Sequence, residues 1–231
     1  MGEMIDFASN GTRGMGYLAH PPKGPGMPLL VIQEWWGLND HIKSVADRFA
    51  AMGFLTLAPD MYRGEVATEP DAAGKAMMGL DLARAAKDLS GAVDELISRT
   101  NNPKVGVTGF CMGGGLALTL ACQRPDAIAA CAPFYGVIPW PEAQPDYTKL
   151  KAYVQGHYAE NDGFASPEHV ATLTATLKAQ GNGVEMYMYK GADHAFFNDT
   201  RPEVFNEEYA HEAFYRAYSF LRQNVRPPMD D

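Results

Sequence analysis

The stretch that most constrains the fold covers residues 105–122 and reads VGVTGFCMGGGLALTLAC. Its first part is rich in β-branched residues, which is typical of a central strand. Its last part is a run of small and apolar residues, which is typical of a helix buried on most of its surface. Between them lies the pattern Gly-x-Cys-x-Gly, centred on Cys111. We therefore predict a strand, a sharp turn and a buried helix.

The glycines around Cys111 are typical of a nucleophile elbow, a strained turn that presents a nucleophile between a strand and a helix. A side chain at Gly109 or Gly113 would strike a neighbouring element. The thiol would lie at the first turn of the helix, where free N–H groups favour a thiolate and a developing oxyanion. This pattern favours acyl transfer. Alternatively, the glycines only permit close packing around an inert, buried cysteine.

Composition limits the classes of protein to which the chain can belong. The 231 residues are 46% hydrophobic and 20% charged, which is ordinary for a globular protein with one sizeable core. The net charge of -9 argues against nucleic acid as a partner, because binding phosphates needs a basic surface. The three cysteines form no Cys-x-x-Cys pair, so neither a zinc site nor a disulfide framework is expected.

We expect no membrane partner. The N-terminal residues have neither a basic flank nor an apolar run long enough for a secretion signal, and no later run could span a bilayer. Cysteine usage fits a reducing compartment, so a cytoplasmic protein is predicted. We expect a single domain over residues 1–231, as a monomer or a small homo-oligomer.

Taken in order, the chain alternates strand and helix patterns. Two short strands around Ser9-Asn10-Gly11 predict a hairpin. Further strand patterns lie at residues 29–32, 54–58, 105–108, 128–134, 152–156 and 184–189, and helix patterns at 42–52, 82–97, 112–122, 167–177 and 210–221. This order predicts an α/β fold with a mostly parallel, doubly wound sheet, an antiparallel N-terminal edge and helices on both faces. Residues 65–79 are a candidate mobile cap, and the loop at 135–140 is a candidate pocket wall.

Three residues with catalytic potential follow the ends of different predicted strands. Cys111 follows one strand, Asp162 a later one and His194 the last, and this order of nucleophile, acid and histidine is that of α/β-hydrolases. His194 would act as general base and then as general acid, because an imidazole can do both near neutral pH. Asp162 would orient the imidazole.

Other carboxylates compete with Asp162 for the role of acid, namely Glu160, Asp193 and Asp199. Asp162 is favoured because its turn directly follows a strand and precedes Pro167. Asp193 adjoins His194 and would point away from the imidazole. A solvated loop carboxylate and a surface histidine are the non-catalytic alternatives.

Four motifs spread over the chain have counterparts in a known family. They are Gln33-Glu34 before two tryptophans and Gly37, the cysteine elbow at 109–114, Asp162, and Gly-Ala-Asp-His-Ala-Phe at 191–196. In this combination the chain resembles the dienelactone hydrolase (carboxymethylenebutenolidase) family. The resemblance implies an α/β-hydrolase fold and cleavage of a small ester or lactone through a Cys-His-Asp triad and an acyl-thioester, without cofactor or metal. It also implies that Glu34 contacts the resting thiol and helps to take its proton when substrate binds.

The resemblance further implies where a substrate would be held. The backbone N–H groups of Met112 and Trp35 would form an oxyanion hole. Tyr135 resembles a family tyrosine near the pocket, while Trp36 and Phe197, like Trp35, could supply apolar walls. Each of these side chains could equally be a core residue.

One departure from the family concerns the substrate. Members that take dienelactone bind its carboxylate with two arginines, and neither is cleanly matched here, since Asn198 occupies the later position. Arg63 and Arg201 are candidates for substrate binding, and each could instead be a surface cation.

The leading prediction is therefore a cofactor-free hydrolase of a small ester or lactone, with dienelactone as one possible substrate. A broader carboxylesterase or thioesterase could use the same triad on substrates without a carboxylate. A protein of another class, in which Cys111 serves reversible oxidation or ligand binding, is the third interpretation.

Overall fold

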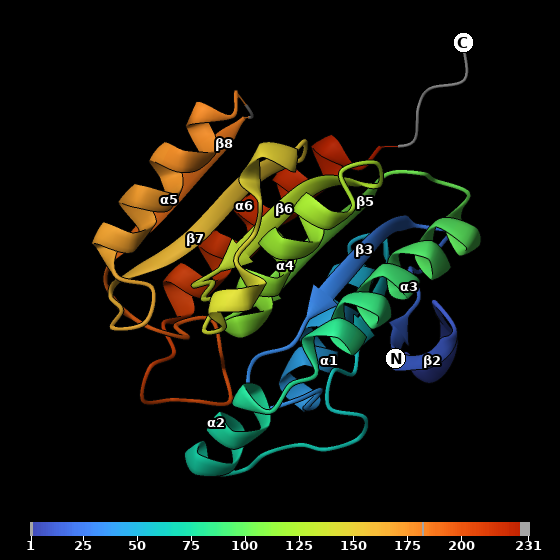
Figure 1. Ribbon diagram of the computed structural model, residues 1–231, viewed down its shortest axis with the longest axis horizontal. Coiled ribbons are helices and arrows are strands. Elements are labelled where there is room, and N and C mark those ends of the chain that lie inside the picture. Colours follow the sequence, from blue (N-terminus) through green and yellow to red (C-terminus); the bar gives the residue numbers. More distant parts are fainter. Residues whose placement is uncertain (1, 182, 227–231) are drawn as a thin grey trace.

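The computed structural model describes residues 2–181 and 183–226, and at its centre these ranges form one eight-stranded sheet (Figure 1). The strand bounds are β1 Glu3–Ser9, β2 Thr12–Ala19, β3 Met27–Ile32, β4 Phe54–Pro59, β5 Val105–Phe110, β6 Ile128–Phe134, β7 Tyr153–Asn161 and β8 Val184–Asp193. The strands lie in the order β1-β2-β4-β3-β5-β6-β7-β8. Strands β3 to β8 run parallel, whereas β1, β2 and β4 are joined by antiparallel pairing. The predicted class, hairpin and sheet direction are confirmed.

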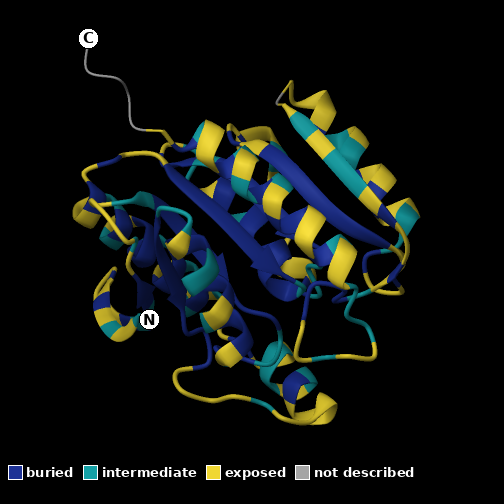
Figure 2. Ribbon diagram, turned by 180° about the vertical axis from the view of Figure 1, so that it is seen from behind, coloured by how far each residue is buried: buried dark blue, intermediate teal, exposed yellow. Residues whose placement is uncertain are grey.

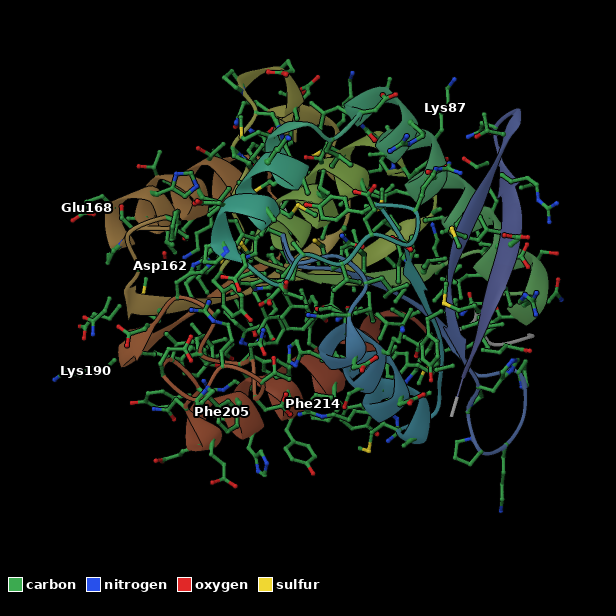
Figure 3. All side chains as sticks on the ribbon, turned by 90° about the horizontal axis from the view of Figure 1, so that it is seen from below. Lys87, Asp162, Glu168, Lys190, Phe205 and Phe214 are labelled. Atoms are coloured by element: carbon green, nitrogen blue, oxygen red, sulfur yellow. The ribbon has the colours of Figure 1, made fainter. Side chains whose placement is uncertain are left out.

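Helices cover both faces of this sheet, as predicted. Their bounds are α1 Asp40–Ala51, α2 Pro70–Met78, α3 Leu82–Thr100, α4 Met112–Gln123, α5 Pro167–Ala179 and α6 Glu207–Asn224, with short 3-10 turns at Pro141–Ala143 and Tyr147–Lys149. Helices α3, α4 and α5 pack on one face, and α1 and α6 pack on the other. Figure 3 shows the two layers from below, with Lys87 of α3 and Phe214 of α6 on opposite sides of the sheet.

Strand β3 shows why the sheet is covered on both faces. Successive side chains of a strand point to opposite faces. Leu30 and Ile32 accordingly join the core under α3 and α4, whereas Leu29 and Val31 join the core under α1 and α6. An apolar run without alternation is therefore buried on both sides. In Figure 2 the central strands are buried throughout, and the helices expose their outer sides.

Residues 65–79, interpreted above as a candidate mobile cap, contain helix α2. Pro70 begins this helix, and Ala73 is its buried residue. One buried position gives no apolar period, so the usual helix signal is missing from the sequence. The indole N–H of Trp140 donates to the carbonyl of Met77 at 3.2 Å and attaches α2 to the loop that follows β6.

The last strand is longer than its apolar pattern predicts. Strand β8 continues beyond Tyr189 to Asp193, where it pairs with Asn161 at the end of β7 across an irregular register. Asp162 and His194 therefore leave two neighbouring strands at the same edge of the sheet. No helix in residues 2–181 and 183–226 has both the length and the apolar character needed to cross a membrane.

Candidate active site

Cys111 occupies the turn between β5 and α4 with a strained backbone. Its φ of 55° and ψ of -121° are backbone angles that residues other than glycine rarely adopt. The surrounding chain holds this turn, because the Cys111 N–H donates to the carbonyl of Phe134 at 3.1 Å. The Cys111 carbonyl in turn accepts from the N–H groups of Gly114 at 3.0 Å and Val137 at 3.1 Å. The end of β6 and the loop that follows it thus hold both backbone polar groups of Cys111.

Two glycines beside the cysteine have no room for a side chain. A β-carbon on Gly109 would lie 2.1 Å from the carbonyl oxygen of Gly113. A β-carbon on Gly113 would lie 2.3 Å from the carbonyl oxygen of Gln33. Helix α4 therefore starts in direct backbone contact with the ends of β3 and β5, as the glycine spacing predicts.

A cavity of about 450 Å³ opens over Cys111. It lies at the carboxyl ends of the parallel strands, where open α/β sheets bind ligands. Its walls combine apolar side chains with a few polar ones and comprise Glu34, Trp35, Trp36, Met77, Cys111, Val137, Ile138, Pro139, Phe164, His169, His194, Ala195 and Arg201. Cys111 is partly exposed, whereas Cys122 and Cys131 are buried. The elbow thiol is therefore accessible from the cavity.

His194 and Asp162 form a buried pair beside this thiol. The imidazole Nδ1 lies 2.7 Å from Asp162 Oδ2. The other oxygen of Asp162 accepts from the backbone N–H groups of Phe164 and Ala165, each at 2.8 Å. The rings of Tyr135 and Phe164 contact the imidazole, with centroids 5.0 and 5.1 Å away. Strand ends and ring contacts thus fix the orientation of His194 toward Cys111, with which it also interacts.

The contact between His194 and Asp162 stabilises the charged forms of both side chains. Burial opposes the charged imidazole, but hydrogen bonds with Asp162 and Cys111 outweigh it and raise the pKa of His194 to about 10. Burial also opposes ionisation of Asp162, but the hydrogen bond from His194 and those from the backbone hold the pKa of Asp162 below its usual value. At neutral pH the pair is therefore an imidazolium beside a carboxylate.

This raised pKa predicts a pH-dependent contribution to stability. Between pH 6.5 and about 10, the folded state keeps the His194 proton that the unfolded chain releases. The contribution is therefore complete below pH 6.5 and is lost as the pH rises through 10. In urea unfolding, the stability of wild type relative to His194→Gln should decline over this window, by at most about 1.4 kcal/mol per pH unit. Parallel stability curves for the two proteins would contradict the pairing.

Glu34 supplies a buried carboxylate to the same cavity. It leaves the end of β3 and has only 1% of its surface exposed. Its Oε1 accepts from the Tyr135 hydroxyl at 3.1 Å, and its Oε2 accepts from the Asn198 side-chain amide at 2.7 Å. Burial, together with the charge of Glu34, raises the pKa of Tyr135 well above its usual value, so the phenol remains a donor. In the sequence, Asn198 stood out only as a departure from a family arginine.

The proposed oxyanion donors lie next to these groups. Met112 is the first residue of α4, so its N–H has no acceptor within the helix. Trp35 follows Glu34, lines the cavity and packs edge-on against Trp36 with ring centroids 5.1 Å apart. An oxyanion hole formed by the N–H groups of Met112 and Trp35 stays a prediction.

Three predicted substrate contacts do not line the cavity, and one of them is Tyr135, which is fully buried and bonded to Glu34. The other two are Phe197 and Arg63. Phe197 is fully buried in the core, with its ring centroid 5.1 Å from that of Phe110 and 5.0 Å from that of Phe134. Arg63 donates to Asp88 at 2.9 Å and to the carbonyl of Arg13 at 2.8 Å. Neither residue lines the cavity. Their sequence neighbourhoods suggested loops near the site, but their side chains are used in packing and in an ion pair.

Arg201 does reach the cavity. Its guanidinium pairs with Glu203 at 2.8 Å and lies 5.9 Å from the ring centroid of Trp36. It is the one lysine or arginine among the described residues that line the cavity.

The carboxylates that competed with Asp162 do not contact the imidazole. Glu160 accepts from the N–H of Gly191 at 2.8 Å, and Asp199 lies 2.9 Å from Nδ1 of His41. Asp193 belongs to the end of β8. Within the described ranges, no three His, Cys, Asp or Glu side chains converge in a way that could hold a metal ion.

Several cavity residues had no functional signal in the sequence. Phe164 and His169 line the cavity from the turn before α5 and from its first turn, and Met77 reaches it from α2. Phe164 lies in a turn and Met77 in a helix without an apolar period, whereas His169 is an exposed position of α5, outside the apolar period that predicted this helix. The loop at 135–140, interpreted as a pocket wall, contributes Val137, Ile138 and Pro139.

Comparisons with known proteins identify the family of this chain. The family model described as the dienelactone hydrolase family matches residues 15–225. The chain is 37% identical to "Protein usf" of Aquifex pyrophilus, over 96% of this chain and 99% of that protein. It is 35% identical to a "Putative carboxymethylenebutenolidase" of Aquifex aeolicus, over 98% of this chain and 100% of that protein.

A solved structure shares the whole fold. It is titled "Putative Dienelactone Hydrolase" from Klebsiella pneumoniae, and it aligns with a TM-score of 0.87 at 26% identity. The alignment covers 96% of this chain and 98% of that structure. The family match, the length of the shared sequence and the shared fold lead to one conclusion: the chain belongs to the dienelactone hydrolase family of ester- and lactone-hydrolysing enzymes, within the α/β-hydrolase superfamily.

Proposed function

We propose that this enzyme cleaves small esters or lactones through an acyl-thioester on Cys111. The observation that carries the proposal is the convergence of Cys111, the His194–Asp162 pair and the buried carboxylate of Glu34 on one cavity. Such a set contains a nucleophile, a proton relay and a proton acceptor, which acyl transfer requires. A redox or ligand-binding role would need neither the oriented histidine nor its acid.

The protonation of His194 gives Glu34 its role in activation. An imidazole that Asp162 stabilises in its protonated form cannot accept a second proton from the thiol, and Cys111 as a thiolate adds to the causes that raise the pKa of His194 to about 10. The Glu34 carboxylate takes the thiol proton instead, and the imidazolium stabilises the resulting thiolate. Glu34 thus accepts the proton and His194 stabilises the thiolate, so the nucleophile is activated by proton transfer within the cavity.

The two half-reactions follow from these charges. The thiolate attacks the ester carbon, and the N–H groups of Met112 and Trp35 stabilise the oxyanion. When the carbon–oxygen bond breaks, the leaving alkoxide takes the proton of His194 and an acyl-thioester remains. Neutral His194 then accepts a proton from water, whose hydroxide attacks the thioester and expels the thiolate. Glu34 returns its proton to the sulfur, so the resting state is restored.

The cavity walls favour substrates without a carboxylate. Most of the lining is apolar or aromatic, including Trp35, Trp36 and Phe164, and its one lysine or arginine in the described residues, Arg201, is already paired with Glu203. A free carboxylate on the substrate would have to compete with this pair. We therefore propose a broad carboxylesterase with a preference for uncharged esters, with dienelactone as a poorer substrate.

Capture of the intermediate tests the mechanism. Acid quenching during the burst phase with p-nitrophenyl acetate, followed by peptide mass spectrometry, should find one acetyl group on Cys111 and none on Cys122. In parallel, kcat/KM should be higher for an uncharged aryl ester than for dienelactone. Burst-phase acetylation of a serine, or turnover without any acetylated peptide, would overturn the thioester mechanism.

A further inference from the structure

Asn198 is a buried polar residue in contact with the carboxylate of the site. It lies on the loop that follows β8, beyond His194, and has 1% of its surface exposed. Its side-chain nitrogen donates to Glu34 Oε2 at 2.7 Å. The contact joins the loop of the histidine to the end of β3, two segments far apart in sequence. Asn198 therefore contacts the site through Glu34, and the roles of Cys111, His194 and Asp162 do not account for this contact.

The amide can present only its donor side to Glu34. Its carbonyl oxygen accepts from the backbone N–H of Thr200 at 3.0 Å and from the Thr200 hydroxyl at 2.7 Å. Because a backbone N–H can only donate, the carbonyl must face Thr200 and the NH₂ group must face Glu34. The orientation of Asn198 is thus set by its own loop, independently of the carboxylate.

Both oxygens of Glu34 are consequently held by neutral donors. Tyr135 binds one oxygen and Asn198 binds the other. In the described part of the chain, no lysine or arginine forms an ion pair with this carboxylate. Two neutral hydrogen bonds stabilise a buried carboxylate less than an ion pair would.

We propose that Asn198 is a positioning residue that holds Glu34 at the proton-accepting geometry while leaving its charge uncompensated. The proposal rests on the proposed function, in which Glu34 takes the proton of Cys111. It goes further by assigning the control of that proton transfer to an amide on the histidine loop. A purely structural Asn198 would tie the loop to β3 without affecting any titration.

Asn198→Asp separates these roles. The substitution keeps the size and the acceptor toward Thr200, but it places a carboxylate oxygen against Glu34 Oε2, where Asn198 Nδ2 now lies at 2.7 Å. Two carboxylates so close share one proton, so ionisation of the pair shifts to higher pH. The titratable or charged groups around this pair are Tyr135, Cys111, His194, His169, Arg201, Asp199 and His41. None of them is changed by the substitution.

The expected result is a change in pH profile as well as in rate. At and below neutral pH, kcat of Asn198→Asp should fall by roughly 10- to 100-fold with KM little changed, given typical general-base contributions, because the shared proton blocks Glu34 as the acceptor. The rate should recover at higher pH, where the pair ionises. The pH profile of Cys111 alkylation by iodoacetamide should shift in the same variant. Asn206→Asp is the matched control, because Asn206 caps α6 through its side-chain oxygen and an aspartate caps equally well. This control should retain both wild-type profiles.

Asn198→Ala keeps the proposal testable if the aspartate variant does not fold. It removes the donor to the carboxylate without adding charge, so kcat should fall and the alkylation profile should shift, though less than in Asn198→Asp. Wild-type kcat and alkylation in both Asn198 variants would overturn the positioning role. That outcome leaves acetylation of Cys111 unaffected, whereas failure of the thioester mechanism would appear in the acetyl-capture experiment with wild-type protein.

Discussion

Replacing Cys111 with alanine should reduce ester hydrolysis to the background rate, a loss of at least ~10⁴-fold in kcat. The substitution removes the atom that forms the acyl bond, and no other described cysteine lines the cavity. The fold should survive, because Cys111 is partly exposed and its backbone is held by hydrogen bonds of Phe134, Gly114 and Val137. Steady-state kinetics with p-nitrophenyl acetate, together with a thermal unfolding curve, measures both effects.

Cys122→Ala is the matched control for this experiment. Cys122 is buried in α4, and burial raises the pKa of Cys122 to about 12, so its thiol is neither accessible nor ionised at neutral pH. The control should keep wild-type kcat and lose some stability from the missing sulfur. Hydrolysis by Cys111→Ala within tenfold of wild type would exclude an acyl-thioester.

Replacing His194 with alanine should lower kcat by roughly 10³- to 10⁴-fold at neutral pH. The variant lacks both the imidazolium that protonates the leaving alkoxide and the base that activates water. It should still fold, because Asp162 keeps its two hydrogen bonds from the backbone of Phe164 and Ala165. Single-turnover kinetics should show that acyl transfer and deacylation are both slowed.

His169→Ala is the control for loss of an imidazole from the same cavity. His169 lines the cavity from the first turn of α5, and Asp162 pairs with His194 rather than with it. Its removal should change KM more than kcat, since it can only touch the substrate. If His169→Ala and His194→Ala reversed these effects, the proton relay would have been assigned to the wrong histidine.

Much of the fold could be predicted because buried strands and the elbow leave strong local patterns. The apolar runs of β3, β4 and β5 are buried on both faces of the sheet, so the residues themselves indicate a parallel arrangement. Helix α2 escaped prediction because it buries one side chain. The end of β8 escaped because its register with β7 is irregular after Tyr189. There the backbone of Gly191 bonds to the side chains of Glu160 and Asn161, and no apolar pattern marks the strand.

The candidate site could be predicted in part, for a related reason. Cys111, Asp162 and His194 follow strands whose ends meet at one edge of the sheet, so topology alone gathers them. The contacts of the loop residues around this edge depend on the direction of each side chain, and this direction cannot be predicted from a loop sequence that has no period. Phe197 turns into the core and Arg63 into an ion pair, whereas Asn198, between Phe197 and Asp199, turns toward Glu34.

The order of the strands also determines when during synthesis this enzyme can become active. The thiol belongs to the middle of the chain, whereas the imidazole follows β8, the last strand to leave the ribosome and the outer strand of its side of the sheet. A nascent chain that ends before β8 carries the nucleophile without its proton relay and exposes the unpaired edge of β7. Under the proposed mechanism, hydrolysis begins only when β8 docks, and we expect the appearance of activity during refolding to mark the pairing of β8 with β7.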